Sequence, residues 1–156
     1  NLSPEEVLKK LNVKLTRESS TNLFVTAFYA IFDNSKKEVR YGNGGHLPVL
    51  YMPVGKKGIF LDVEDGAPLG LIEGEYSGRR INYSSGDIFV FYTDGITEAM
   101  NSRHDMYGKE RLAEVVYRNR KLDPKELLSA IEKDVRRFEP KSTQHDDMTI
   151  ITLKIV

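Results

Sequence analysis

Residues 86–98 read Gly-Asp-Ile-Phe-Val-Phe-Tyr-Thr-Asp-Gly-Ile-Thr-Glu, and this stretch decides the fold. Residues 87–93 combine β-branched and aromatic side chains at the length of a strand. The strand leads directly into Asp94-Gly95, and Asp-Gly is a common turn dipeptide. A carboxylate that follows a buried strand is also held rigidly, as a metal ligand should be. Taken alone, this stretch fits a turn or a ligand.

A second acidic site, Asp146-Asp147, immediately precedes the last predicted strand at residues 148–156. Neighbouring carboxylates repel each other, so their pairing is costly unless a cation or solvent relieves it. A solvated loop with an Asx-type turn is the alternative. If the strands at 87–93 and 148–156 pair antiparallel, the end of one meets the start of the other at one edge of a sheet. That convergence favours a metal site over two unrelated loops.

The rest of the chain predicts helices that cover a largely antiparallel sheet system, which is an α+β fold. A capping box at residues 3–6 opens the first helix, and Pro140 is expected to stop the last one. No repeat or linker interrupts the pattern, so we expect a single domain over residues 1–156, with its middle strands forming an antiparallel meander. Helices are predicted at 3–17, 109–117 and from 123 onward, and strands at 23–32, 38–43, 49–53, 58–61, 75–83, 87–93 and 148–156.

Composition excludes several classes of protein. Lys and Arg number 23, as do Asp and Glu, and this +0 balance argues against binding a nucleic-acid backbone. The absence of Cys excludes thiolate metal sites and cysteine nucleophiles, and it fits a reducing compartment such as the cytoplasm. The longest near-apolar stretch, residues 23–32, is half of the roughly 20 residues that a membrane-spanning helix needs. No signal sequence opens the chain, so no membrane segment is expected.

A Gly-rich segment at residues 41–48, Tyr-Gly-Asn-Gly-Gly-His-Leu-Pro, is the third place of interest. Three Gly in four residues indicate backbone freedom or a close approach by another segment. His46 is a candidate ligand or acid–base group, but a single His in such a turn is more often structural, and the same holds for His104 and His145. No phosphate-binding loop or nucleophile-elbow motif occurs.

Six motifs then follow one another in a familiar order. They are FVTAFY (24–29), YGNGGHLP (41–48), APLGL (67–71), GDIFVFYTDGITE (86–98), YGKERL (107–112) and QHDDMTII (144–151). Together they resemble the stage-II-sporulation-E-like (SpoIIE-like) phosphatases, the sigma-factor-regulator branch of the metal-dependent type-2C Ser/Thr protein phosphatases. The resemblance runs over essentially the whole chain.

The resemblance implies an α-β-β-α sandwich, with two mainly antiparallel sheets flanked by helices and two Mn²⁺ or Mg²⁺ ions at one edge. It makes Asp94 and Asp146 the catalytic metal ligands and gives Gly95 and Asp147 supporting roles. The segment that holds His46 is a family signature rather than a ligand set. Two such ions activate water for direct attack on phosphorus, so no side-chain nucleophile is needed.

One family motif has no counterpart in the chain. Relatives carry an upstream Gly-Asp-x-x-Gly-x-Gly segment whose Asp bridges both metals, so we expect an N-terminally truncated domain. Without that Asp, the 156 residues alone should hold at most one weakly bound ion and show no Mn²⁺-stimulated activity. Missing upstream strands would also leave a sheet edge uncovered, which predicts a homodimer.

The expected function is hydrolysis of phosphoserine or phosphothreonine on an anti-sigma-factor antagonist, under control of an upstream sensory or regulatory region. Substrate and regulator follow from the resemblance alone. Two alternatives remain open at this point. One is a catalytically silent regulator with the same fold, and the other is a metal-dependent hydrolase of small phosphate esters.

Overall fold

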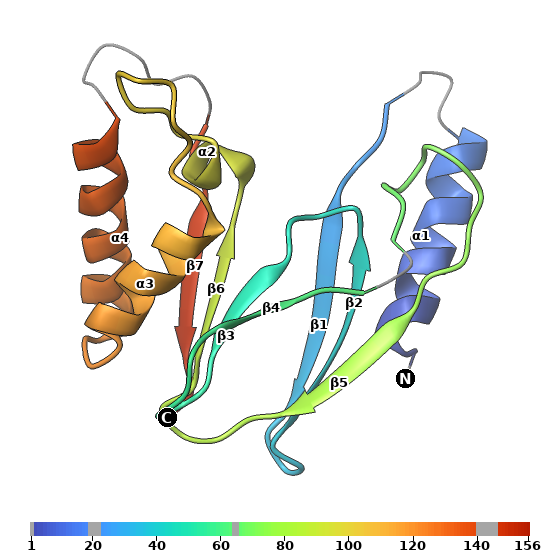
Figure 1. Cartoon of the computed structure of the whole chain (residues 1–156). Helices are drawn as coiled ribbons and strands as arrows, with labels where there is room; N and C mark the ends of the chain where they lie inside the picture. The colour runs from blue at the N-terminus through green and yellow to red at the C-terminus, as the bar shows by residue number, and fades with distance from the viewer. Residues whose placement is uncertain (1, 19–22, 64–65, 140–146) are drawn as a thin grey trace. The chain divides into compact units, whose positions relative to one another are not determined.

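The structure is a computed structural model that describes residues 2–18, 23–63, 66–139 and 147–156. Its chain divides into two units, Asn1–Pro48 with Asp62–Tyr83 and Val49–Leu61 with Ser84–Val156. Figure 1 shows one sheet in each unit, with α1 (Pro4–Glu18) beside the first sheet and α3 (Lys109–Asn119) and α4 (Pro124–Phe138) beside the second. Among the helices described, none is both long enough and apolar enough to cross a membrane.

The first unit is one helix packed on a three-stranded antiparallel sheet. Its elements are α1 (Pro4–Glu18), β1 (Ala27–Asp33), β2 (Glu38–Gly44) and β5 (Gly78–Asn82), and the strand order is β1-β2-β5. The predicted capping interaction is present, since the Ser3 amide donates to the Glu6 carboxylate over 2.8 Å. The predicted hairpin is confirmed as β1 and β2, although the strand begins at Ala27 rather than Leu23.

Close packing and a buried amide hold α1 in place. A Cβ on Gly42 of β2 would lie 2.9 Å from the Leu8 side chain of α1, so glycine allows the helix to approach the sheet. Asn12 is fully buried, and its side chain donates to the Ile72 carbonyl over 2.9 Å and accepts from the Gly70 amide over 2.7 Å. The helix is thereby tied to the loop that precedes β5.

The second unit combines a four-stranded antiparallel sheet with three helices. The sheet has the order β4-β3-β6-β7, and Figure 1 shows α3 and α4 beside it. The elements are β3 (Val49–Met52), β4 (Ile59–Leu61), β6 (Ile88–Tyr92), α2 (Asp94–Thr97), α3 (Lys109–Asn119), α4 (Pro124–Phe138) and β7 (Ile150–Lys154).

The core of this unit forms where the helices meet the sheet. The predicted apolar stripe of α4 is confirmed, because Leu127, Ile131 and Val135 are all fully buried. Asp123 caps this helix through a complete capping box with Glu126, as the Asp-Pro start predicts. The helix ends at Phe138, and Pro140, the predicted stop, lies outside the described residues.

The α+β class with antiparallel sheets is confirmed, but the predicted meander is wrong. In a meander each strand pairs with the next, whereas β2 pairs with β5 and β3 pairs with β6. The chain leaves the first sheet after Gly44 and enters the second at Val49, and it returns for β5 before β6. Pro48 lies between the two strands, and it cannot donate a ladder hydrogen bond.

Candidate metal centre

Asp94 lies where β6 ends and a single helical turn begins. The strand before it is buried, and Thr93 occupies the N-cap of α2 with extended backbone angles. The Asp94 carbonyl accepts from the Glu98 amide over 2.7 Å, which closes the turn. The Asp-Gly dipeptide fits a turn, and the structure has a four-residue helix at this position. The backbone that carries the Asp94 carboxylate is thus fixed on both sides.

The Asp94 carboxylate is exposed and keeps most of its acceptor capacity. Its one hydrogen bond within the described residues comes from the adjacent Gly95 amide, over 3.0 Å. An ionised carboxylate offers about four lone-pair positions. Asp94 therefore has oxygen lone pairs available for a hard cation such as Mg²⁺ or Mn²⁺.

Strand β7 brings Asp147, the described residue of the second acidic site, to the same edge of the sheet. Strands β6 and β7 pair antiparallel with Tyr92 opposite Ile150, which is the pairing that the convergence argument required. Thr93 extends the pairing beyond the strands. Its amide donates to the Thr149 carbonyl over 3.1 Å, and its hydroxyl accepts from the Thr149 amide over 3.0 Å.

Thr93 also contacts the segment that carries the second acidic site. Its hydroxyl donates to the Asp147 carbonyl over 3.2 Å. The Thr93 side chain therefore links the chain next to Asp94 with the chain at Asp147. Sequence analysis did not single out Thr93. Its position between a buried strand and an acidic residue was the available signal, but its two partners follow only from the pairing of β6 with β7.

Gly95 permits the closest approach between these segments. A Cβ at this buried position would lie 2.6 Å from the Asp147 carbonyl oxygen and 3.5 Å from the Met148 Cα. Real Cβ atoms do not approach so closely, so any larger residue would displace the chain at 147–148. The glycine therefore sets the distance between the end of β6 and the chain that enters β7.

The structure describes three of the four residues of the predicted site. Asp94, Gly95 and Asp147 lie together at one edge of the β6–β7 pair, and the Asp147 side chain is exposed. Asp146, the other predicted ligand, lies outside the described residues. Within the described ranges, no three His, Cys, Asp or Glu side chains gather into a group that could hold a metal. The described residues supply one of the predicted ligands, Asp94, and its carboxylate oxygens suit a hard cation.

Tyr92 has an unusual environment next to the site. Its hydroxyl is buried and has no hydrogen-bond partner within the described residues. Burial raises the pKa of Tyr92 to about 12, and the negative charge of Glu110 adds to this effect. Tyr92 is therefore a neutral phenol at physiological pH.

The Gly-rich segment containing His46 forms a tight turn. The buried Asn43 side chain donates to the His46 carbonyl and accepts from the His46 amide, each over 2.8 Å. Gly45 has a positive φ of +72°, and a Cβ there would lie 2.7 Å from the Pro68 ring. The backbone of this motif is therefore held by its own asparagine and packs against the 67–71 motif.

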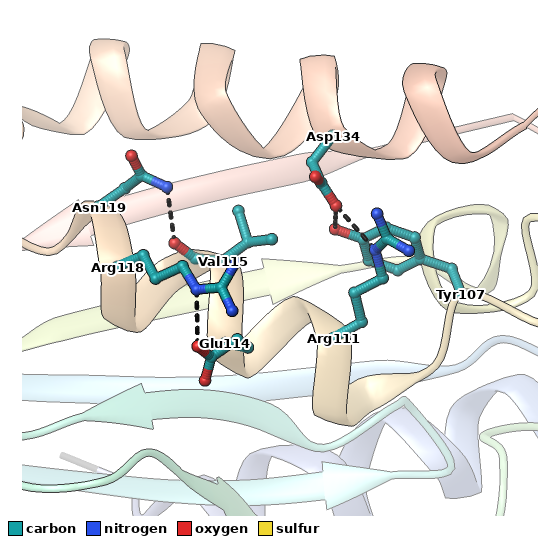
Figure 2. A network of polar contacts seen from close by, with 7 residues as sticks. All are labelled: Tyr107, Arg111, Glu114, Val115, Arg118, Asn119 and Asp134. Carbon is teal, nitrogen blue, oxygen red and sulfur yellow. Dashed lines mark hydrogen bonds and ion pairs between the residues drawn. The ribbon is translucent and has the colours of Figure 1, made fainter.

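The YGKERL motif joins α3 to α4, as Figure 2 shows. The Tyr107 hydroxyl and the Arg111 guanidinium both donate to one Asp134 carboxylate oxygen, each over 2.9 Å. The Arg111 hydrogen bond is the main cause that lowers the pKa of Asp134, with the Tyr107 bond also contributing. Arg111 also lies over the Phe138 ring at 4.6 Å. This motif fixes the helices, and the Gly108 amide also donates to the Thr97 carbonyl at the end of α2 over 2.9 Å.

Solved structures with the same fold define the class of protein. The PP2C domain of SiaA from Pseudomonas aeruginosa superposes with a TM-score of 0.85 at 18% identity, covering 99% of this chain and 61% of that one. The phosphatase domain of SpoIIE from Bacillus subtilis, in a Mn-presoaked crystal, gives 0.69 at 17% identity, covering 99% and 68%. The fold is thus that of PP2C phosphatase domains, as the resemblance predicted.

Sequence comparison places the chain more narrowly. The family profile described as "Stage II sporulation protein E (SpoIIE)" matches residues 1–156, and the chain belongs to this family. A curated relative, "Phosphoserine phosphatase RsbU" of Bacillus subtilis (strain 168), is 26% identical over 155 residues. That alignment covers 98% of this chain and 45% of the relative, so the chain spans about half the length of the relative it matches.

Proposed function

We propose that this chain is part of a metal-dependent phosphoprotein phosphatase that hydrolyses phosphoserine or phosphothreonine on an anti-sigma-factor antagonist. Its SpoIIE family membership and its likeness to a phosphoserine phosphatase support the reaction class. The observation that carries the proposal is the exposed Asp94 carboxylate, fixed at the end of β6 beside the chain that follows Asp146.

In the proposed site, Asp94 and Asp146 would hold Mn²⁺ or Mg²⁺, and two ions are expected in the intact domain. When bound, these ions would lower the pKa of a coordinated water and neutralise charge on the phosphoryl oxygens. The chain itself supplies position. Gly95 and Thr93 hold the end of β6 close to the backbone at Asp147. Asp147 itself would have a supporting role.

The proposal extends to control and location. We propose a cytoplasmic protein in which a sensory or regulatory region upstream of this domain sets its activity. We also propose that residues 1–156 belong to one phosphatase domain and self-associate when isolated. In the described part of the second sheet, β7 is an edge strand whose Ile151 and Leu153 are 57% and 36% exposed. Such apolar edges favour association.

The test is the activity of Asp94→Asn in the full-length protein. Asn preserves the shape of the side chain but removes its charge, so Mn²⁺-dependent release of phosphate from a phosphorylated antagonist protein should fall at least about a hundredfold. Asp105→Asn is a matched control on an exposed loop and should retain full activity.

Two results would overturn the proposal. Wild-type protein that binds the phosphorylated antagonist without Mn²⁺-dependent hydrolysis would be a silent regulator. Wild-type protein that hydrolyses p-nitrophenyl phosphate readily but leaves phosphoproteins intact would be a small-ester hydrolase.

A further inference from the structure

The first unit contains a pocket whose lining includes none of the residues assigned to the metal centre. It has a volume of about 210 Å³ and is bordered by the start of α1 and by strands β2 and β5. Three arginines line it, Arg40 from β2 and Arg79 and Arg80 from β5, and Ser3 and Glu5 border it on the helix side. From the sequence alone, the short basic cluster Arg79-Arg80 is interpreted as solvated surface.

The strand register places Arg40 and Arg80 directly opposite each other. Directly opposed residues point to the same face, with Cβ atoms roughly 4.5–5.5 Å apart. The face is identified by the next pair on it, Gly42 opposite Gly78, because a Cβ on Gly42 would contact Leu8 of α1. The two guanidinium groups therefore leave the sheet on the side that carries α1, beside the start of the helix.

Neither Arg40 nor Arg80 has a charged or hydrogen-bonded partner within the described residues. Five other arginines of the chain, by contrast, form ion pairs: Arg17, Arg103, Arg111, Arg118 and Arg136. Like charges directly opposite each other in a sheet are destabilising. The sequence thus maintains an unfavourable pair of charges inside a pocket, which is the arrangement expected where an anion binds.

Two carboxylates lie near Arg40 and Arg80, but neither forms an ion pair with these arginines. Glu5 borders the pocket, and its carboxylate occupies the space that a Cβ on Gly78 would need, without an ion pair to Arg40 or Arg80. Glu38 is two residues before Arg40 on the same face, opposite Asn82, and it is likewise unpaired with the arginines. Glu5 would therefore repel an incoming anion. Its replacement by Gln should strengthen anion binding, whereas replacement of either arginine should weaken it.

We propose that Arg40 and Arg80 form a metal-independent binding site for a phosphate group, either free phosphate or a phosphorylated side chain. A planar guanidinium donates two parallel hydrogen bonds to phosphate oxygens, and two guanidinium groups match the charge of a phosphate dianion. The Ser3 hydroxyl at the border of the pocket is a further donor. The site is additional to the proposed catalytic function and needs none of its residues.

Inorganic phosphate is the first probe, titrated by calorimetry into the full-length protein in EDTA, which excludes binding through a divalent cation. Arg40→Gln and Arg80→Gln should each weaken binding about tenfold, the value of one lost charge-assisted hydrogen bond. Glu5→Gln should tighten binding roughly threefold by removing a nearby negative charge. Arg136→Gln, on the exposed side of α4, should bind phosphate as the wild type does.

Thermal unfolding supplies a second signature. Without phosphate, Arg80→Gln should raise the midpoint by about 1–2 °C because it relieves the repulsion with Arg40. Phosphate should then stabilise the wild type and leave this variant almost unchanged. Tighter binding of O-phosphoserine than of inorganic phosphate would assign the site to a phosphorylated side chain, and the reverse order to the free ion. Equal phosphate affinity for the wild type and both Arg variants, or no binding at all, would overturn the proposal.

Discussion

Asp87 and Asp94 flank the two ends of β6, and their carboxylates have opposite surroundings. Asp87 is 3% exposed and accepts hydrogen bonds from the Tyr51 hydroxyl, the Val54 amide and the Ser84 amide over 2.6, 2.7 and 2.8 Å. Asp94 is exposed, with only the adjacent Gly95 amide donating to it among the described residues. One carboxylate is saturated by the fold, whereas the other has lone pairs left for a ligand. The same residue type on one strand can thus be structural or functional, and hydrogen-bond accounting separates the two.

The largest expected effect concerns which carboxylate works with Asp94. Asp146→Asn should reduce Mn²⁺-dependent phosphatase activity of the full-length protein at least about a hundredfold, because it removes a proposed ligand. Asp147→Asn should cost less than about tenfold, because its proposed role is support. Steady-state kinetics on the two variants decides the matter. Equal losses, or the reverse order, would show that the ligand has been assigned to the wrong aspartate.

The next prediction concerns stability, to which Asp87 should contribute more than Asp94. Asp87→Asn should lower the free energy of unfolding by about 2–4 kcal/mol. The NH₂ group of Asn would face an N–H or O–H group that donates a hydrogen bond to the carboxylate in the wild type. Asp94→Asn should change the same quantity by less than about 0.5 kcal/mol, as exposed substitutions do. Urea unfolding in metal-free buffer measures both. Similar losses for the two variants would remove the distinction between the strand ends.

Gly95→Ala tests the packing that sets the site. The added Cβ would lie 2.6 Å from the Asp147 carbonyl, so we expect a loss of about 1–3 kcal/mol in unfolding free energy. Phosphatase activity should fall with it, since the chain at 147–148 must shift. Gly74→Ala is the matched control because no atom lies within 4 Å of its Cβ position, and urea unfolding should show almost no change. A variant at Gly95 as stable and active as the control would contradict the account.

The smallest effect contrasts two tyrosines of the same unit. Tyr92→Phe removes a buried hydroxyl that has no partner in the described structure, so it should raise the free energy of unfolding by up to about 1 kcal/mol. Tyr51→Phe removes a donor to Asp87 and should lower it by about 1–2 kcal/mol. Both are read from chemical denaturation curves. If both variants shift the free energy of unfolding in the same direction, the hydrogen-bond partners of the two hydroxyl groups do not explain their effects on stability.

Local sequence patterns predicted the elements better than their partners. The capping signals before α1 and α4 and the apolar stripe of α4 are local, and each is confirmed. The pairing of β2 with β5 joins residues about forty positions apart, and nothing local distinguishes it from the predicted meander.

The candidate site shows the same division. Asp94 follows directly from its motif, because an acidic residue after a buried strand is visible in the sequence. Asp87 was predicted only as the first residue of the strand at 87–93. Its hydrogen bond from Tyr51 joins it to a residue of another strand. Thr93 gains its role only when residues 147–149 come alongside it. Residues whose function depends on a distant partner were the ones that sequence reasoning missed.

The most direct test of the central claim is a Mn²⁺ titration of the full-length protein, followed by electron paramagnetic resonance of the free ion. The account predicts two bound Mn²⁺ per wild-type chain and in Asp105→Asn. It predicts that Asp94→Asn loses at least one of them or binds at least about tenfold more weakly. Unchanged stoichiometry and affinity in Asp94→Asn would contradict a metal centre at the end of β6.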